Sequence, residues 1–260
     1  MGRSFTRRGF GRGVRNALAA AAVTRFAAGS ASSALASPAS QVTTADGRVY
    51  DAYVQPAPKH GQFYNYTCEF DAAWMILAAF GHDRPFEELL EIVGHDRSVE
   101  PWYEETAQGF VIYGGDITSA FSGDFTSNPL ARASGAAFKP LFEHFDLSAI
   151  AISTRDELQS ALDNGQLIWT KATVDFLPWA DTTWITPAGE EVATVLGNDH
   201  CLVVNGYNQD VVVISDPLGP TSTNWERPYE YEVPWETFLS VWAAQNQDAL
   251  AVGPASASAP

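Results

Sequence analysis

The sequence predicts an α+β fold in a single domain, because helix-forming segments lie mainly in the first half of the chain and β-rich runs in the second. The 260 residues are 46% hydrophobic and 12% aromatic, so the chain can bury a core and is not broadly disordered. We predict a signal peptide at residues 1–36, a linker at 37–47, a folded domain at 48–253 and a disordered tail at 254–260.

Two early helices are predicted from segments that end at glycine. Residues 72–80 (AAWMILAAF) are helix formers throughout and stop at Gly81. Because they are apolar on all sides, we expect this helix to be buried. A second helix is predicted from a cap at Asp83, with Pro85 in its first turn, to Gly94.

Later segments predict a further helix, then strands. Residues 98–146 show little periodicity, which predicts loops with short helices. Thr154-Arg155-Asp156-Glu157 is a capping-box pattern that opens a helix ending at Gly165, and Pro234 starts another helix. Strands are predicted at residues 48–54, 166–174, 201–208, 211–215 and 248–252, and the pair 201–208 and 211–215 is expected to form a hairpin.

The first 36 residues have the layout of a signal peptide. They contain six Arg and no acidic residue, an Ala-rich stretch at 17–28, and a cleavage pattern at Ala34-Leu35-Ala36. Thr6-Arg7-Arg8-Gly9-Phe10 resembles the twin-arginine export signal. The apolar run is shorter than the roughly 20 residues of a membrane span. We therefore expect export by the twin-arginine route to the extracellular space or the cell envelope.

Charge and cysteine content exclude several kinds of partner. The formal net charge is −16, and outside the first 36 residues nine Lys and Arg face 31 Asp and Glu, giving −22. Nucleic acid and an anionic membrane surface are therefore not expected to bind. Two cysteines without a Cys-x-x-Cys pair exclude a disulfide scaffold and a structural zinc site. We expect no cofactor, and a peptide or protein as the substrate.

Two histidines in a repeated tripeptide, His82-Asp83-Arg84 and His95-Asp96-Arg97, raise the question of a metal site. The helix between them places the two rings about 20 Å apart, which is too far to share an ion. We interpret the repeat as two similar helix boundaries and expect no metal.

Cys68 stands directly before the buried helix at 72–80. A cysteine at a helix N-terminus meets the positive end of the helix dipole, which lowers the thiol pKa and favours the nucleophilic thiolate. His200 begins a β-run and is the expected base, and Asp216 ends the partner strand of the predicted hairpin, within reach of the imidazole. Gln62 is a neutral donor that, with the Cys68 N–H, is expected to hold an oxyanion.

The order of these residues resembles the C39-like peptidases, a family of papain-fold cysteine peptidases. The resemblance is carried by Gln62-Phe63-Tyr64-Asn65-Tyr66-Thr67-Cys68, by the run from His200 to Gly206-Tyr207, and by Asp216-Pro217, and it covers about residues 55–252. It implies a Cys68-bearing helix packed on an antiparallel sheet that carries His200 and Asp216. It also implies Cys68 as nucleophile, His200 as base, Asp216 as orienting residue and Gln62 as oxyanion donor.

The sequence departs from the family after the nucleophile, where Glu69 replaces the usual glycine. If Glu69 points inward, its carboxylate raises the cysteine pKa and crowds the site, where it would contact substrate. Otherwise Glu69 and Asp71 are first-turn acids that complement the helix dipole. Trp179 and Trp184 lie in an apparent loop and are expected to line a substrate cleft.

A disulfide between Cys68 and Cys201 is the alternative for an exported chain with two cysteines. Because neighbouring strand residues face opposite sides, Cys201 is expected to face away from the site if His200 faces it. The disulfide and the triad would then exclude each other.

These features together predict an exported cysteine peptidase that hydrolyses peptide or related amide bonds. Two alternatives keep the fold: an inactive exported peptide-binding protein, and a cell-wall amidase or acyltransferase with the same triad.

Replacement of both Arg7 and Arg8 by Lys is expected to block export, because the twin-arginine route requires the paired guanidinium groups. Fractionation of cells that express the wild-type chain and the double variant measures this. Equal export of the two proteins would contradict the assignment of this route.

Overall fold

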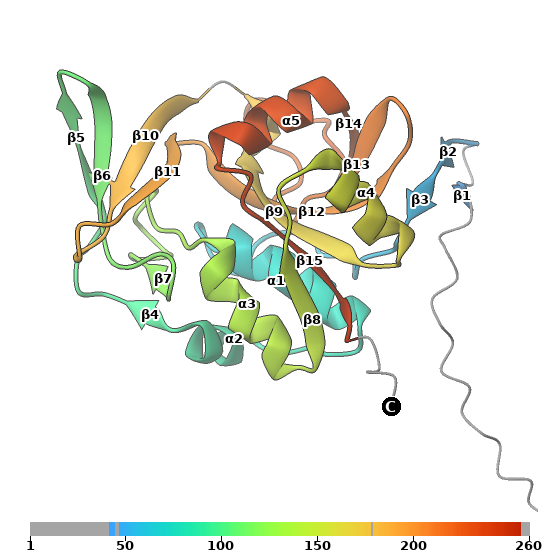
Figure 1. The fold of residues 1–260 in the computed structure, drawn as a ribbon, viewed down its shortest axis with the longest axis horizontal. Helices are drawn as coiled ribbons and strands as arrows, with labels where there is room; N and C mark the ends of the chain where they lie inside the picture. Colours follow the sequence, from blue (N-terminus) through green and yellow to red (C-terminus); the bar gives the residue numbers. More distant parts are fainter. Residues whose placement is uncertain (1–41, 45–46, 178, 256–260) are drawn as a thin grey trace, which may run out of the picture. The chain divides into compact units, whose positions relative to one another are not determined.

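A seven-stranded antiparallel sheet is the centre of the fold in the computed structural model, which describes residues 42–44, 47–177 and 179–255 (Figure 1). Its strands are β3 (Ala52–Tyr53), β8 (Leu147–Ala151), β9 (Leu167–Thr173), β12 (Asp199–Tyr207), β13 (Val211–Ser215), β14 (Glu230–Pro234) and β15 (Ala249–Pro254). Six of them follow the order β14-β13-β12-β9-β15-β8, and β3 pairs with β12.

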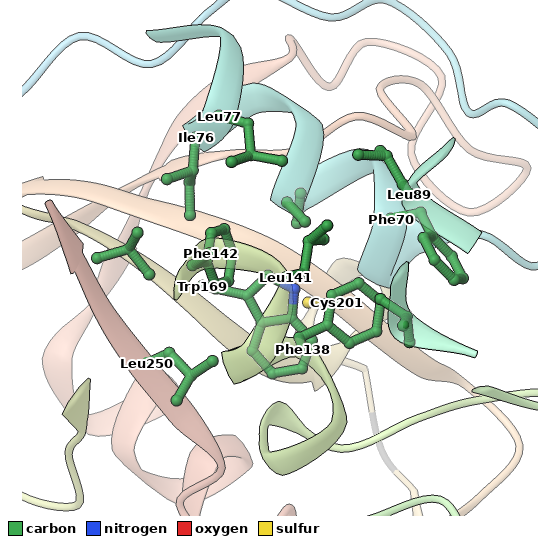
Figure 2. Packing of buried hydrophobic residues seen from close by; sticks show 14 of the residues in the cluster. Phe70, Ile76, Leu77, Leu89, Phe138, Leu141, Phe142, Trp169, Cys201 and Leu250 are labelled. Atoms are coloured by element: carbon green, nitrogen blue, oxygen red, sulfur yellow. The ribbon is translucent and has the colours of Figure 1, made fainter. Parts of the chain in front are cut away.

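Helices cover both faces of this sheet (Figure 1). One face carries α1 (Cys68–Ala79), α2 (Phe86–Val93) and α3 (Gly135–His144), and the other carries α4 (Arg155–Asp163) and α5 (Trp235–Ala244). Alternate strand residues divide between two apolar cores: Trp169 and Cys201 pack toward α1 and α3, whereas Ile168 and Leu202 pack toward α4 and α5. Figure 2 shows Trp169, Cys201 and Phe138 in the first of these cores.

A second, four-stranded sheet has a small apolar core of its own. Its order is β11-β10-β6-β5, formed by β5 (Trp102–Thr106), β6 (Gly109–Tyr113), β10 (Ala180–Ile185) and β11 (Glu191–Leu196). Two further pairs join β1 (Val42–Thr43) to β2 (Val49–Tyr50) and β4 (His95–Asp96) to β7 (Phe121–Ser122), and a short 3-10 turn, η1, spans Val174–Phe176. Trp184 is fully buried in the core of the second sheet.

The mixed α and β composition with an antiparallel central sheet agrees with the predicted fold class, whereas the pairs β10–β6 and β4–β7 are parallel. The capping box forms as expected: Thr154 Oγ1 accepts from the Glu157 N–H at 3.2 Å, and Glu157 Oε2 accepts from the Thr154 N–H at 3.0 Å. The hairpin of β12 and β13 and the helix after Pro234 are also present. These elements are encoded locally, by caps and alternating apolar residues.

Several predicted boundaries are wrong. Residues 98–146 are not only loops and short helices, because β5 and β6 form a hairpin there; β5 is almost wholly exposed and therefore lacks an alternating pattern. Part of the expected linker forms β1, the strand predicted at 48–54 is divided into β2 and β3, and Pro254 of the expected tail ends β15. The predicted signal peptide lies outside the described residues.

No helix among the described residues has both the length and the apolarity needed to cross a membrane.

The Phe70→Ala variant is expected to lower the free energy of unfolding by about 3–5 kcal/mol, because it leaves a cavity in the core on α1. The Phe70 ring is fully buried and lies 4.9 Å from the ring of Phe138, centroid to centroid. Chemical denaturation measures the loss, and the control Ile150→Ala, at a position 55% exposed, should cost less than about 1 kcal/mol. Equal losses in the two variants would contradict this account of the core.

Candidate active site

Cys68 is the first residue of α1, so its backbone N–H and thiol lie at the N-terminus of a buried helix. The approach to this helix is fixed by Asp71, whose carboxylate accepts from the Phe63 N–H at 2.9 Å and the Thr67 hydroxyl at 2.8 Å. Lys59 forms a salt bridge with the same carboxylate at 3.2 Å. Burial raises the pKa of Asp71 to about 6, although the Thr67 and Lys59 contacts act in the opposite direction. These contacts hold the loop that carries Gln62 against the start of α1.

His200 and Asp216 form a buried hydrogen-bonded pair, in which His200 Nε2 lies 2.9 Å from Asp216 Oδ1. His200 lies near the start of β12 and Asp216 directly follows β13, so the antiparallel hairpin brings them together. Asp216 also accepts from the Leu218 N–H at 2.8 Å and the Tyr231 hydroxyl at 3.1 Å. His200 and Asp216 therefore lie within hydrogen-bond distance of each other, as the predicted hairpin requires.

The groups that surround the Asp216 carboxylate favour its ionised form. Burial by itself raises its pKa, but the His200 ring and the Arg227 guanidinium, 3.0 Å away, together hold the pKa below the ordinary value. An ionised Asp216 orients the imidazole through Nε2, which leaves Nδ1 as the ring nitrogen that does not face the carboxylate.

Cys68, His200 and Gln62 line one pocket of about 280 Å³. Its remaining walls come from the loop before α1, the 129–131 segment, η1, the turn into β12 and the loop after Asp216. They are Asn65, Tyr66, Pro129, Ala131, Val174, Gly197, Asn198, Asp199 and Leu218. Asp216 supports this pocket from behind, through its bond to His200.

The side-chain amide of Gln62 lies directly beside the backbone N–H of Cys68. With its oxygen turned toward Cys68, the amide accepts from that N–H at 3.2 Å and donates to the Asn65 carbonyl at 3.2 Å. A 180° turn of the amide instead points its NH₂ group to the same side as the Cys68 N–H. Both groups are then donors, and an oxyanion that enters between them would be the acceptor that they lack.

Glu69 points inward and is fully buried. Its Oε2 accepts from the Cys68 thiol, with Sγ and Oε2 3.2 Å apart, and its Oε1 lies 2.6 Å from Lys171 Nζ. Lys171 Nζ also lies 2.8 Å from Asp199 Oδ2, and Arg132 Nε lies 3.8 Å from the same oxygen. We call Glu69, Lys171, Asp199 and Arg132 the buried ion network.

The buried ion network changes the ionisation of the nucleophile. Burial, followed by the charge of Glu69, raises the pKa of the Cys68 thiol well above its ordinary value, and Lys171 acts in the opposite direction. Burial alone lowers the pKa of Lys171, but Asp199 and Glu69 outweigh burial and raise it. The resting cysteine is therefore a thiol that donates to Glu69.

The two tryptophans predicted to line a cleft do not line this pocket. Trp184 lies in strand β10 rather than in a loop, is fully buried, and donates from Nε1 to the Gly115 carbonyl at 2.9 Å. Trp179 is half-buried, donates to Asp181 at 2.8 Å, and packs against the core under α4 and α5. The loop prediction failed because β10 pairs with the distant strand β6, a contact that local sequence does not reveal.

Cys201 is a free, fully buried thiol, and Cys68 is also free. The expectation that Cys201 faces away from the site is wrong. Cys201 lies on the face of the sheet that carries α1, in the same apolar core as Cys68. His200 instead lines the pocket from the second residue of β12, beside the turn that precedes the strand.

Sequence reasoning missed the partners of Glu69. Lys171 is a lone charge within the predicted strand 166–174, and a charge in a buried strand requires a partner. Asp199 directly precedes His200, a position that offered a second signal. The repeated histidines do not meet: His95 Nε2 contacts the Gly123 carbonyl at 2.8 Å, whereas the His82 ring lies against Phe145.

Comparisons with known proteins agree with this architecture. A family model described as the Peptidase_C39 like family matches residues 49–250. The uncharacterized protein YvpB of Bacillus subtilis (strain 168) is 26% identical over 185 residues, which cover 67% of this chain and 66% of that protein, just under two thirds of its length. A crystal structure described as a candidate C39-like peptidase from Bacillus anthracis matches with a TM-score of 0.60 and 20% identity, over 78% of this chain and 98% of that one.

The structural likeness, at this low identity, shows the fold. The family model spans most of the described residues, including Cys68, His200 and Asp216. The chain therefore belongs to the Peptidase_C39 like family.

Proposed function

We propose that this protein is an exported, papain-like cysteine peptidase that hydrolyses peptide bonds with Cys68, His200 and Asp216. The observation that carries the proposal is that Cys68 and His200 line the same pocket. The imidazole of His200 is hydrogen-bonded to Asp216, which is buried and ionised. Nucleophile, base and orienting carboxylate are thus supplied by a helix start and one hairpin.

The proposed reaction begins when the Cys68 proton moves to Nδ1 of His200. The thiolate sulfur forms a bond to the scissile carbonyl carbon, and the carbonyl oxygen becomes an oxyanion held by the Cys68 N–H and the turned Gln62 amide. His200 then gives its proton to the leaving amine as the C–N bond breaks, which leaves a thioester on Cys68. Water, deprotonated by His200, hydrolyses the thioester and restores the thiol.

Glu69 sets the resting state in this proposal. Its hydrogen bond keeps the thiol protonated, so the thiol proton must pass to His200 when the sulfur attacks. The 2.6 Å bond to Lys171 holds Glu69 in place and offsets its charge, which limits the rise in the Cys68 pKa.

One observation favours a second function, an exported peptide-binding protein of the same fold without catalysis. The pKa of Cys68 is raised, whereas an activated nucleophilic cysteine has a lowered pKa. Cleavage and thiol-labelling measurements separate the two functions.

Peptide cleavage is expected to require both Cys68 and His200. A mixed peptide library incubated with the protein and read by mass spectrometry should show cleavage that the Cys68→Ala variant abolishes and the His200→Ala variant reduces by about 100-fold or more. His144→Ala, which changes an exposed histidine on α3, is the matched control and should retain full activity. Binding of peptides without Cys68-dependent cleavage would overturn the peptidase proposal and favour the binding protein.

The pH at which Cys68 becomes reactive is expected to fall in the Glu69→Gln variant. Removal of the carboxylate charge stabilises the thiolate, so the midpoint of Cys68 alkylation should move down by about one pH unit or more. Rates of iodoacetamide labelling across pH, with the modified site located by mass spectrometry, measure this midpoint. Glu87→Gln in the exposed first turn of α2 is the control, and an unchanged midpoint in Glu69→Gln would refute this role.

A further inference from the structure

A second, largely apolar cavity of about 520 Å³ lies at the start of the β5–β6 hairpin. Its walls are the hairpin entry, the 128–130 loop and the end of β11; they are Pro101, Trp102, Tyr103, Asn128, Pro129, Leu130, Leu196 and Gly197. We call this cavity the hairpin pocket.

The hairpin pocket adjoins the pocket that contains Cys68 and His200. Pro129 and Gly197 line both cavities, so the two share a rim. On one side, the chain passes from Leu130 in the hairpin pocket to Ala131 in the Cys68 pocket. On the other side, it passes from Leu196 through the turn to His200.

That turn is short and is hydrogen-bonded to η1. Gly197 and Asn198 both have positive φ, 65° and 54°, a conformation that glycine and asparagine tolerate best. Two hydrogen bonds join Asn198 to η1: the Val174 N–H donates to the Asn198 carbonyl at 3.1 Å, and Asn198 Nδ2 donates to the Val174 carbonyl at 3.2 Å. The turn that leads from the hairpin pocket to His200 is therefore held against η1 by these two bonds.

Contacts within the protein hold the walls of the hairpin pocket in place. The Trp102 ring stacks on the Tyr113 ring, with centroids 4.7 Å apart. Asn128 fixes the facing loop, since its Nδ2 donates to the Pro101 carbonyl at 2.9 Å and its Oδ1 accepts from the Leu130 N–H at 2.9 Å. Ordered walls reduce the entropy that binding would otherwise cost.

The surface of this pocket is apolar and its surroundings are acidic. Trp102 and Tyr103 are 49% and 52% exposed, which leaves large aromatic area uncovered. Glu104 and Glu105 follow directly on the same exposed strand. An apolar side chain gains from this surface, and an acidic one is repelled.

We propose that the hairpin pocket binds a large apolar side chain, aromatic or leucine-like, of the peptide whose carbonyl group lies at Cys68. This inference rests on the proposed function and names its substrate class. An extended peptide advances about 3.3 Å per residue, so a chain crossing the shared rim places a side chain in the hairpin pocket within a few residues of the scissile bond. Trp102 is then a specificity-determining residue.

The test uses peptides that the wild-type protein cleaves, in versions with Phe, Leu, Ala or Glu at the position that the pocket receives. Trp102→Ala should lower kcat/KM for the Phe and Leu peptides by about tenfold or more and change the Ala peptide by less than about twofold. Trp102→Phe should restore most of the loss. Trp225→Ala, at an exposed Trp outside both pockets, is the control and should change neither.

Binding to the Cys68→Ala protein separates failure of this inference from failure of the peptidase proposal. Calorimetry with the Phe and Ala peptides needs no catalysis, and the Phe peptide should bind about tenfold more tightly, a preference that Trp102→Ala removes. Equal affinities for the two peptides, or an equal effect of Trp102→Ala on both, would overturn the inference even if the protein cleaves peptides. A preserved preference without cleavage would support the pocket and refute the peptidase proposal.

Discussion

The bond between Glu69 and Lys171 is the contact on which the arrangement of the site depends. It joins α1 to the central strand β9, and Lys171 extends the connection to Asp199, the residue before His200. One buried ammonium thus links the segment that carries the nucleophile to the segment that carries the proposed base. Because a buried charge without its partner is costly, each member of the network holds the others in register.

The same contact that positions Cys68 also opposes its ionisation. A helix N-terminus favours a thiolate, but this influence is about 0.3–1 kcal/mol at exposed sites and rises to about 2 kcal/mol in partly buried ones. In this protein, burial and the adjacent Glu69 charge are stronger, and the net effect raises the pKa of the thiol. The glycine usual in the family would remove the charge, but it would also remove the carboxylate that anchors α1 to Lys171.

Asp216 illustrates the opposite balance. It is as deeply buried as Glu69, but His200, Arg227 and the Leu218 N–H contact it, and these contacts lower its pKa despite burial. The base is thereby given a stable orientation while the nucleophile is kept protonated. In the proposed reaction, the thiol gives its proton to His200 as the sulfur attacks, and the His200–Asp216 pair stays in place.

The sequence by itself determined the elements that depend on neighbouring residues: an apolar helix just after Cys68, the capping box at Thr154 and the hairpin that brings His200 to Asp216. The structure begins that helix at Cys68, four residues before the predicted start. Caps and alternation act within a few residues, so one sequence reports them. Only the tertiary structure decided the inward direction of Glu69, its bond to Lys171 102 residues away, the burial of Trp184 and the side on which Cys201 packs. These features arise from pairing between distant segments, and their energy comes from burial that no local pattern encodes.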